Sequence, residues 1–440
     1  MSREAARTAR RLILPVRHEI IALAQTLVRI DTCATPPDGK EAGAQRALYR
    51  FLKRNGVDAE IYDTGFLNDS DHPMVRHQRN YAGRPNVIAR LQGNGRGRSL
   101  LLNGHMDTVP PGMGSWRESP WSGSIRNGRL YGRGSFDMKG GLAAQFGVCL
   151  ALKKAGIRLG GDLLCESVVD EEWAGGGGSL AARLRGDTAD ACAIGEVTGL
   201  SVFRATRGGH FFEITARAGD PAHYFSRAEV VGPAVPMGRL LGWIDCWAEK
   251  RRRIDTGEAY ADFADPAPVQ VLALEANRFE AHVPWSVPLE AKVRVYFQFL
   301  PGEDVEAAVR AIKKSFKGFC EDDPFFSVHC PRWRDIVYPP LSGHELPADH
   351  PWTRCLTTAA STVLRRPVAA SAAEFPCDAF LMQNHFGIPT LIFGPAGSGA
   401  HNVNEYVTIS SVLRTAEVLL AAALTWCGGT VTSVPHLSVK

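Results

Sequence analysis

Short, mostly apolar runs alternate with helical stretches over the first half of the chain. The runs have the length and composition of strands buried on both faces, and they occupy residues 86–91, 99–102, 162–169 and 191–194. Residues 16–30 and 140–154 show the three- and four-residue apolar spacing of helices. This alternation predicts a doubly wound α/β domain, with a mostly parallel sheet and helices on both of its faces.

The apolar pattern changes near Thr206. Residues 210–217 and 289–300 alternate between apolar and polar positions, which is typical of strands with one exposed face. Helical spacing follows each of them, over residues 235–253 and 305–316. This part of the chain predicts a small α+β domain in which two helices cover an antiparallel sheet.

Features of the first domain return toward the C-terminus. Residues 390–394 form a short apolar run, and residues 410–426 have the spacing of an apolar helix. We therefore expect one catalytic α/β domain that is divided by an inserted domain. The expected catalytic domain comprises residues 1–205 and 323–440, and the expected insertion comprises residues 206–322.

The composition is that of a soluble globular protein with two or three domains, because 45% of its 440 residues are hydrophobic. The 50 basic and 46 acidic residues give a formal charge of only +4, which argues against nucleic acid or an anionic membrane as partner. No apolar run approaches the roughly 20 residues that a membrane-spanning helix needs. The ten cysteines include no CxxC pair, which favours reduced thiols in a cytoplasmic protein.

The N-terminus allows one alternative location. Residues 1–11 are rich in arginine, a feature that an organellar presequence would share. The apolar stretch that follows, residues 12–16, is short and lacks the core of a signal peptide. We favour the simpler interpretation, in which these residues lead into the first helix.

Side chains that bind metals stand at strand ends or beside glycines. They are His105, Asp137, Glu171, Glu172, Glu196 and His401. The carboxyl ends of parallel strands meet at one edge of a sheet, so one crevice is expected to collect several of these side chains. Imidazole and carboxylate are zinc ligands, and a two-metal site needs a carboxylate that bridges both ions. The pattern therefore predicts a two-metal hydrolase.

The motifs around these side chains follow one another in the order of a known family. They occupy residues 104–110, Trp116 with Pro120, and residues 132–141, 170–172, 195–196, 394–395 and 400–405. On these motifs the chain resembles the metal-dependent amidohydrolase family of acetylornithine deacetylase, succinyl-diaminopimelate desuccinylase, aminoacylase and bacterial glutamate carboxypeptidase. The resemblance implies a catalytic α/β domain and an inserted domain that forms a homodimer, here through residues 206–322.

The same resemblance implies how two divalent metal ions would be held. His105 and Glu196 would bind one ion, and Glu172 and His401 would bind the other. Asp137 would bridge the two. We expect zinc in this carboxylate-rich site, with cobalt or manganese as alternatives, because metal availability also decides which ion is bound.

Three further residues would complete the catalytic machinery implied by the resemblance. Asp107 would accept the second ring proton of His105 and so orient that ligand. Glu171 would be the general base, taking a proton from a metal-activated water and passing it to the leaving nitrogen. His223 would reach into the partner subunit and stabilise the oxyanion; a surface histidine in a loop is the alternative.

The inserted domain departs from the family pattern. Gln298 stands where an arginine is usual, and Trp285 stands near the usual position of an asparagine. An arginine there suits a substrate carboxylate through a bidentate ion pair, which a glutamine cannot form. Both residues are candidates for substrate binding. The alternatives are a solvent-facing strand residue for Gln298 and interface packing for Trp285.

One more candidate lies in the last segment, where Asp378 would either line the substrate pocket or cap a helix N-terminus. Arg204, Arg207 or Arg294 would be needed to replace the charge missing at Gln298.

The expected reaction is hydrolysis of an amide C–N bond in a small N-acylated molecule, with an N-acyl amino acid such as acetylornithine as the first choice. The changed inserted domain also makes a less usual bond credible, in an aromatic amide, a carbamoyl compound or a ring amine. A dipeptidase or carboxypeptidase is a third possibility, against which the missing arginine argues. A non-catalytic binding protein is disfavoured, because every expected metal ligand and Glu171 are present.

Overall fold

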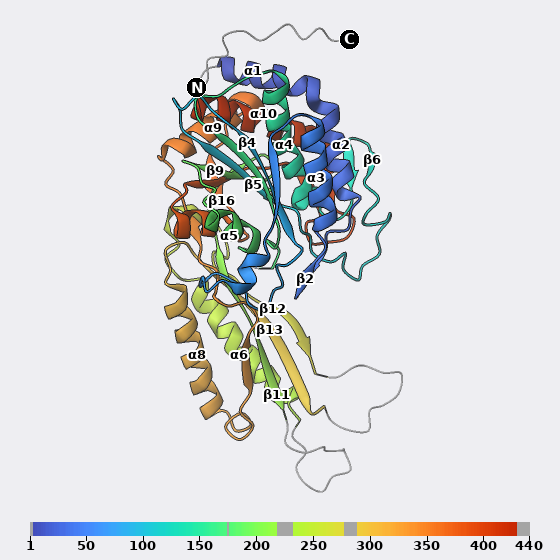
Figure 1. The fold of residues 1–440 in the computed structure, drawn as a ribbon. Helices are drawn as coiled ribbons and strands as arrows, with labels where there is room; N and C mark the ends of the chain where they lie inside the picture. Colours follow the sequence, from blue (N-terminus) through green and yellow to red (C-terminus); the bar gives the residue numbers. More distant parts are fainter. Residues whose placement is uncertain (1–2, 174–175, 218–231, 277–287, 429–440) are drawn as a thin grey trace. The chain divides into compact units, whose positions relative to one another are not determined.

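The computed structural model describes residues 3–173, 176–217, 232–276 and 288–428 (Figure 1). The chain divides into two compact units. Unit 1 comprises Met1–Ala205, Leu346–Ala373 and Cys377–Lys440, and unit 2 comprises Thr206–Glu345 and Glu374–Pro376. Residues 323–345 were expected in the catalytic domain but belong to unit 2, because strand β14 (Arg332–Asp335) pairs with β11 (Gly208–Arg217).

The helices and strands of unit 1 follow in chain order. The helices are α1 (Arg3–Ile13), α2 (Arg17–Val28), α3 (Ala42–Arg54), α4 (Gly140–Lys154), α5 (Gly177–Leu184), α9 (Pro351–Leu364) and α10 (Ile409–Trp426), with the short turns η1 (Leu14–Val16), η2 (Gly65–Asp69), η3 (Ser135–Lys139) and η4 (Leu381–His385). The strands are β1 (Ala34–Thr35), β2 (Asp38–Gly39), β3 (Ala59–Asp63), β4 (Pro85–Leu91), β5 (Leu100–His105), β6 (Ser124–Arg126), β7 (Arg129–Tyr131), β8 (Leu163–Val168), β9 (Cys192–Ile194), β10 (Val202–Thr206), β16 (Ala370–Ala372), β17 (Thr390–Ile392), β18 (Gly397–Ser398) and β19 (Tyr406–Thr408).

The central sheet of unit 1 has the order β10-β17-β9-β5-β8-β4-β3, and β16 also pairs with β10. Its middle strands β17, β9, β5 and β8 are parallel to one another, whereas β4 and β3 add an antiparallel edge. This confirms the predicted mostly parallel sheet.

Helices cover both faces of this sheet, as the alternation along β8 shows. The Cys165 thiol lies 2.8 Å from the Cys149 thiol of α4, and the next residue, Glu166, pairs with Arg183 of α5 at 2.6 Å. Successive side chains of a strand point to opposite faces, so α4 and α5 lie on opposite sides of the sheet. The runs of unbroken apolar sequence in β5 and β8 are therefore buried from both sides, and both strands are buried along their length.

Helix α10 is long and apolar enough to cross a membrane by length and composition alone. It packs against α1, α4 and α9, and 67% of it is buried inside the protein. In this structure α10 is a core helix of unit 1.

A second, smaller sheet of unit 1 has the order β18-β19-β7-β6. It pairs β19, which follows the His401 loop, with β7, which precedes the segment that carries Asp137. The sequence pattern did not predict this sheet, because its strands are only two or three residues long.

Unit 2 is built on an antiparallel sheet with the order β12-β13-β11-β14. Its remaining elements are α6 (Ala234–Arg251), α7 (Gly257–Tyr260), β12 (Val269–Glu275), β13 (Glu290–Phe299), α8 (Val305–Asp322) and β15 (His344–Glu345). Alternate residues of β11, including Phe212 and Ile214, pack with α6 and α8 in a single apolar cluster, so both helices cover one face of the sheet (Figure 1). The indole N–H groups of Trp243 and Trp247 on α6 both donate to the Ser315 hydroxyl on α8. This is the expected α+β arrangement.

Candidate metal centre

Two of the predicted ligands and the predicted base meet at the carboxyl edge of the parallel sheet. His105 is the last residue of β5, and the turns that carry Glu171 and Glu196 follow the neighbouring strands β8 and β9. The Nε2 atom of His105 lies 3.2 Å from Glu196 Oε1 and 3.9 Å from Glu171 Oε2. Parallel pairing of the three strands therefore brings together side chains that are far apart in the sequence.

Asp137 lies between the two histidines. Its Oδ1 atom is 3.2 Å from His105 Nε2, and its Oδ2 atom is 3.2 Å from His401 Nε2. Glu172 Oε2 lies 2.8 Å from the same nitrogen of His401. A carboxylate whose two oxygens face two different imidazoles is placed as a ligand bridging two metal ions would be.

The charges of these groups call for cations. Burial raises the pKa of Glu172 to about 7, and repulsion from Asp137 acts in the same direction. Burial alone would lower the pKa of His401, but hydrogen bonds to Asp137 and Glu172 outweigh it and raise that pKa to about 11. Without metal ions, a proton on the imidazole offsets part of the negative charge of the carboxylates. Bound metal ions would take over this role.

The atoms available also fit metal ions. The structure brings His105, Glu171 and Glu196 into one group of potential ligands, and His105, Asp137 and Glu172 into another. Glu172 Oε1 is buried and has no hydrogen-bond partner among the described residues. The donor set of carboxylate oxygens and imidazole nitrogens suits divalent ions such as zinc.

Asp107 orients the site by two routes, one of which differs from the prediction. The His105 ring nitrogen Nδ1 lies 2.9 Å from the main-chain oxygen of Asp107 but 3.7 Å from its carboxylate. The main-chain oxygen is therefore the acceptor that leaves Nε2 free for a metal. The Asp107 carboxylate instead accepts the main-chain N–H groups of Glu171 and Glu172, at 3.2 and 3.0 Å. It fixes the turn that presents the proposed base and a proposed ligand.

A buried charge network supports the same turn. Asp170 has a left-handed backbone conformation, with φ 69°, and its side chain is fully buried. Its Oδ1 atom accepts hydrogen bonds from the guanidinium groups of Arg79 and Arg84, and Arg84 also pairs with the buried Glu41. Sequence reasoning gave these arginines no role, because they lie about 90 residues from Asp170 in loops with no motif of their own.

Glu405 holds the segment that carries Asp137. One carboxylate oxygen accepts the main-chain N–H groups of Phe136 and Asp137, at 2.8 and 3.0 Å. The other accepts from Arg133 Nη1 at 2.7 Å and from the main-chain N–H of Gly134 at 2.9 Å. Glu405 was noted only as part of the His401 motif, and its place four residues after a ligand was the one signal of a role.

Gln298 is buried in unit 2, with 5% of its surface exposed, which excludes the solvent-facing alternative. It lies on β13 opposite Gly209, and its side-chain oxygen accepts a hydrogen bond from Arg207 at 3.2 Å. Of the arginines considered as replacements for the missing charge, Arg207 thus contacts Gln298, whereas Arg294 pairs with Glu213.

Asp378 is buried. It begins the helical segment that leads into η4, because its main-chain oxygen accepts hydrogen bonds from the main-chain N–H groups of Leu381 and Met382. Its carboxylate does not cap that segment; it accepts the main-chain N–H of Gly176, just before α5, at 3.0 Å. Burial raises the pKa of Asp378 to about 6.

The other two candidates, His223 and Trp285, lie outside the described residues.

The sequence profile of the peptidase family M20/M25/M40 matches residues 101–425. N-formyl-4-amino-5-aminomethyl-2-methylpyrimidine deformylase of Bacillus subtilis is 25% identical and aligns over 93% of this chain and 95% of its own length. Succinyl-diaminopimelate desuccinylase of Gluconacetobacter diazotrophicus is 26% identical over 93% of this chain and 97% of its own length. The dipeptidase Dug1p of Saccharomyces cerevisiae shares the fold, with a TM-score of 0.77 at 16% identity over 98% of this chain and all of its own. The profile covers well over half of the sequence, and the protein is therefore an enzyme of the hydrolase family M20/M25/M40.

Proposed function

We propose that this protein is a two-metal hydrolase that cleaves the amide C–N bond of a small N-acylated amine. The observation that carries the proposal is the position of Asp137, whose two oxygens face His105 and His401. Glu171 stands beside this group, and its Oε2 atom lies 3.9 Å from His105 Nε2, farther than the 3.2 Å from Asp137 or Glu196 to the same nitrogen. The proposed base, Glu171, is thus a different residue from the proposed bridging ligand, Asp137, and from the other proposed ligands. Separate residues for metal binding and proton transfer suit hydrolysis by an activated water.

Two divalent ions, held by His105, Asp137, Glu172, Glu196 and His401, would lower the pKa of a water and polarise the substrate carbonyl. Glu171 accepts the proton of the attacking water, and the resulting carboxylic acid then donates this proton to the leaving nitrogen as the C–N bond breaks. The hydrogen bonds from the main-chain N–H groups of Glu171 and Glu172 to Asp107 keep both carboxylates in place during these steps. We expect zinc, with cobalt or manganese as alternatives.

The relatives support a particular class of substrate. The deformylase and the desuccinylase are both named for the removal of an acyl group from an amine nitrogen. In the inserted domain, the neutral Gln298 stands where an arginine would suit a substrate carboxylate. We therefore propose an N-acylated amine, with an N-acyl amino acid and an N-formylated heteroaromatic amine as the two leading substrate types, ahead of dipeptides.

Three further assignments belong to the proposal. His223 donates a hydrogen bond to the oxyanion from the partner subunit of a homodimer formed through residues 206–322. The substrate is a small molecule, bound also through Gln298, Trp285 or Asp378. All ten cysteines are free thiols, which supports a reducing compartment such as the cytoplasm.

The test is a substrate screen of the purified, metal-loaded protein against N-acyl amino acids, N-formylated heteroaromatic amines, aromatic amides and dipeptides, scored by release of amine. The Glu171→Gln variant, loaded in the same way, is the matched control. Turnover of acylated amines by the wild-type protein alone would support the proposal. Turnover restricted to dipeptides, or equal in both proteins, would refute the substrate class or the general base respectively.

A further inference from the structure

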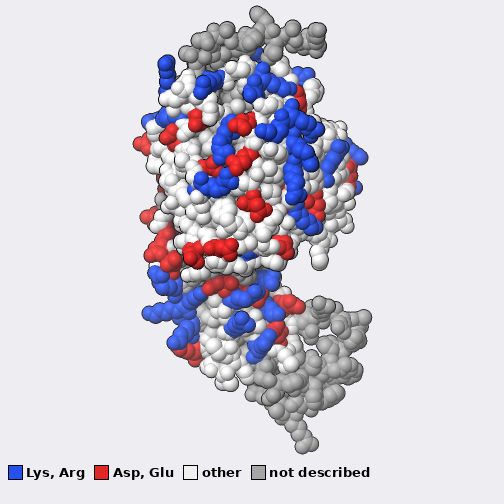
Figure 2. Space-filling view, viewed as in Figure 1, with Lys and Arg blue, Asp and Glu red and all other residues white. Residues whose placement is uncertain are grey.

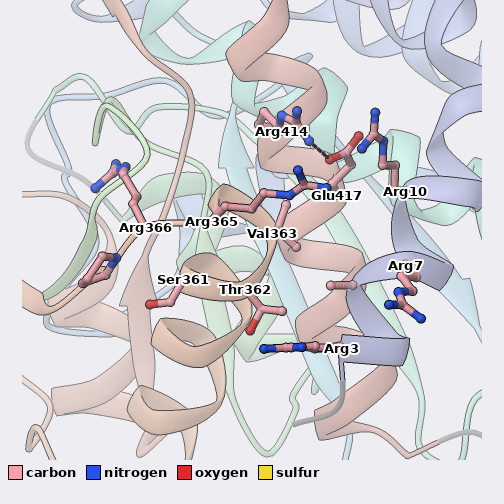
Figure 3. Close-up of a pocket in the computed structure, with 12 residues that line it drawn as sticks. Arg3, Arg7, Arg10, Ser361, Thr362, Val363, Arg365, Arg366, Arg414 and Glu417 are labelled. Atoms are coloured by element: carbon pink, nitrogen blue, oxygen red, sulfur yellow. Dashed lines mark hydrogen bonds and ion pairs between the residues drawn. The ribbon is translucent and has the colours of Figure 1, made fainter.

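A cavity of about 810 Å³ lies in unit 1 among helix α1, the C-terminal end of α9 and helix α10 (Figure 3). Its charged lining consists of one acidic residue, Glu417, and six arginines: Arg3, Arg7, Arg10, Arg365, Arg366 and Arg414. The face in Figure 2 carries side chains of both signs, whereas six of the seven charged residues in the wall of this cavity are basic. None of these residues belongs to the candidate metal centre.

The arginines come from two sides of the cavity. Arg3, Arg7 and Arg10 follow one another at helical spacing on α1, on the side opposite the buried residues Ala9 and Leu12. Arg365 and Arg366 follow the last residue of α9 and line the other side (Figure 3). The arginine-rich N-terminus that looked like a lead-in to the first helix is thus one wall of a cavity.

Most of these charges lack an acidic partner. Arg414 pairs with Glu417 at 2.6 Å, and Arg366 donates to the main-chain oxygen of Leu200. Within the described part of the chain, no carboxylate forms an ion pair with Arg3, Arg7, Arg10 or Arg365. These four arginines are exposed, whereas buried arginines of unit 1, such as Arg84, Arg133 and Arg183, each have an acidic partner. Like charges gathered without counter-charges repel one another, and a bound anion would relieve this repulsion.

The helix dipole does not explain this cluster. Cations near a helix C-terminus are favourable, which suffices for Arg10 in the last turn of α1 and for Arg365 beside the end of α9. Arg3, however, is the first residue of α1, where a positive charge is unfavourable. Glu4, in the same turn, supplies one negative charge, and an anion in the cavity would supply another.

We propose that this cavity binds a small soluble anion that carries two or more phosphate groups. The guanidinium group presents paired N–H donors that match phosphate oxygens, and it keeps its charge at any physiological pH. The cavity volume lies within the range of small-molecule sites, about 300–1,000 Å³. Arginines on two sides suit an anion with more than one charged group. This inference does not depend on the proposed function.

Isothermal titration calorimetry on the metal-loaded protein at about 0.1 M salt tests the proposal. The probes are fructose 1,6-bisphosphate, inorganic phosphate, and vesicles of phosphatidylcholine with phosphatidylglycerol. The variants are Arg10→Gln and Arg365→Gln, one from each wall, and the control is Arg11→Gln. Arg11 neighbours Arg10 on α1 but does not line the cavity, so its loss changes the net charge equally.

The wild-type protein should bind the bisphosphate more tightly than inorganic phosphate. Each wall variant should bind it at least about tenfold more weakly, and Arg11→Gln should match the wild type. Circular dichroism and thermal unfolding confirm that the variants are folded. The proposal is overturned if the bisphosphate does not bind at concentrations of about 1 mM, or if all three variants weaken binding equally. Binding to anionic vesicles without binding of the soluble bisphosphate overturns it as well.

Discussion

The substitution Glu405→Gln should loosen the segment that carries Asp137 and weaken metal binding. The Glu405 side chain is fully buried, and its two oxygens accept four hydrogen bonds. A glutamine has the same shape, but it replaces one acceptor oxygen with an NH₂ donor. Whichever way the amide turns, two of the four donors lose their acceptor.

The cost follows from which pair of donors is lost. If the amide nitrogen faces Phe136 and Asp137, two hydrogen bonds to a charged acceptor disappear, each worth about 1.5–3 kcal/mol. If it faces Gly134 and Arg133, the buried guanidinium loses its carboxylate, which costs about 3–5 kcal/mol. Both orientations therefore predict a loss of at least about 3 kcal/mol in the free energy of unfolding. Displacement of Asp137 should add a loss of about 10–100-fold in metal affinity, as is usual for residues that orient metal ligands.

The matched control is Glu166→Gln. Glu166 is also buried in unit 1 and also pairs with an arginine, Arg183. Within the described part of the chain, its side-chain hydrogen bonds to Asn103 and Arg183 do not reach the segment around Asp137. Urea unfolding measures the stability of both variants, and competition with a chelator measures their metal affinity. Both variants should lose stability, and Glu405→Gln alone should lose metal affinity. A folded Glu405→Gln protein with wild-type metal affinity would refute the positioning role.

Three other changes test separate parts of the structure. Glu171→Gln should keep both metals, checked by elemental analysis, and lose about 10²–10⁴-fold in turnover; near-normal rates would remove Glu171 as the base. Burial alone would raise the pKa of Asp335 in unit 2. The hydrogen bonds of its carboxylate, of which the one with His210 has the largest effect, outweigh burial and hold this pKa below its usual range. Asp335 thus stabilises the fold above about pH 4, and this contribution is lost as pH falls through the lowered pKa. Urea unfolding of Asp335→Asn should show a loss of about 2 kcal/mol at neutral pH that shrinks below about pH 3; a pH-independent difference would contradict the ion pairing. A β-carbon at Gly141 would overlap the main-chain oxygen of Gly195, so Gly141→Ala should lower the melting temperature, and an unchanged value would show that the two segments separate freely.

The sequence predicted the layers of the molecule well, because periodicity records burial. Continuous apolar runs marked β5 and β8, which are buried along both faces, and alternating runs marked β11 and β13. The division between the units was harder to place. Residues 323–345 contain the short β14, and its membership in unit 2 depends on pairing with β11, more than 100 residues away, which no local pattern records.

The candidate ligands were recognisable for a similar reason. Each follows a strand or a glycine-rich turn, and the parallel order of β5, β8 and β9 brings their ends together. The residues that hold the ligands in place were not recognisable in the same way. Arg84 and Glu405 are ordinary charged residues in sequence, and their roles arise only from partners brought close by the fold.

The two ligand-bearing turns share a further property that explains why such partners are needed. His401 and Asp170, the residue before Glu171, both have positive φ values, 57° and 69°, in a region that side chains other than glycine adopt at a cost. In the Asp170 turn, buried hydrogen bonds from Arg79 and Arg84 offset this cost. In the His401 loop the same function falls to Glu405, whose contact with Arg133 spans 272 residues of sequence. The geometry of the metal centre is therefore held by long-range buried charges rather than by the local conformational preferences of its own loops, so these charges, as much as the ligands, should decide whether the centre binds metal.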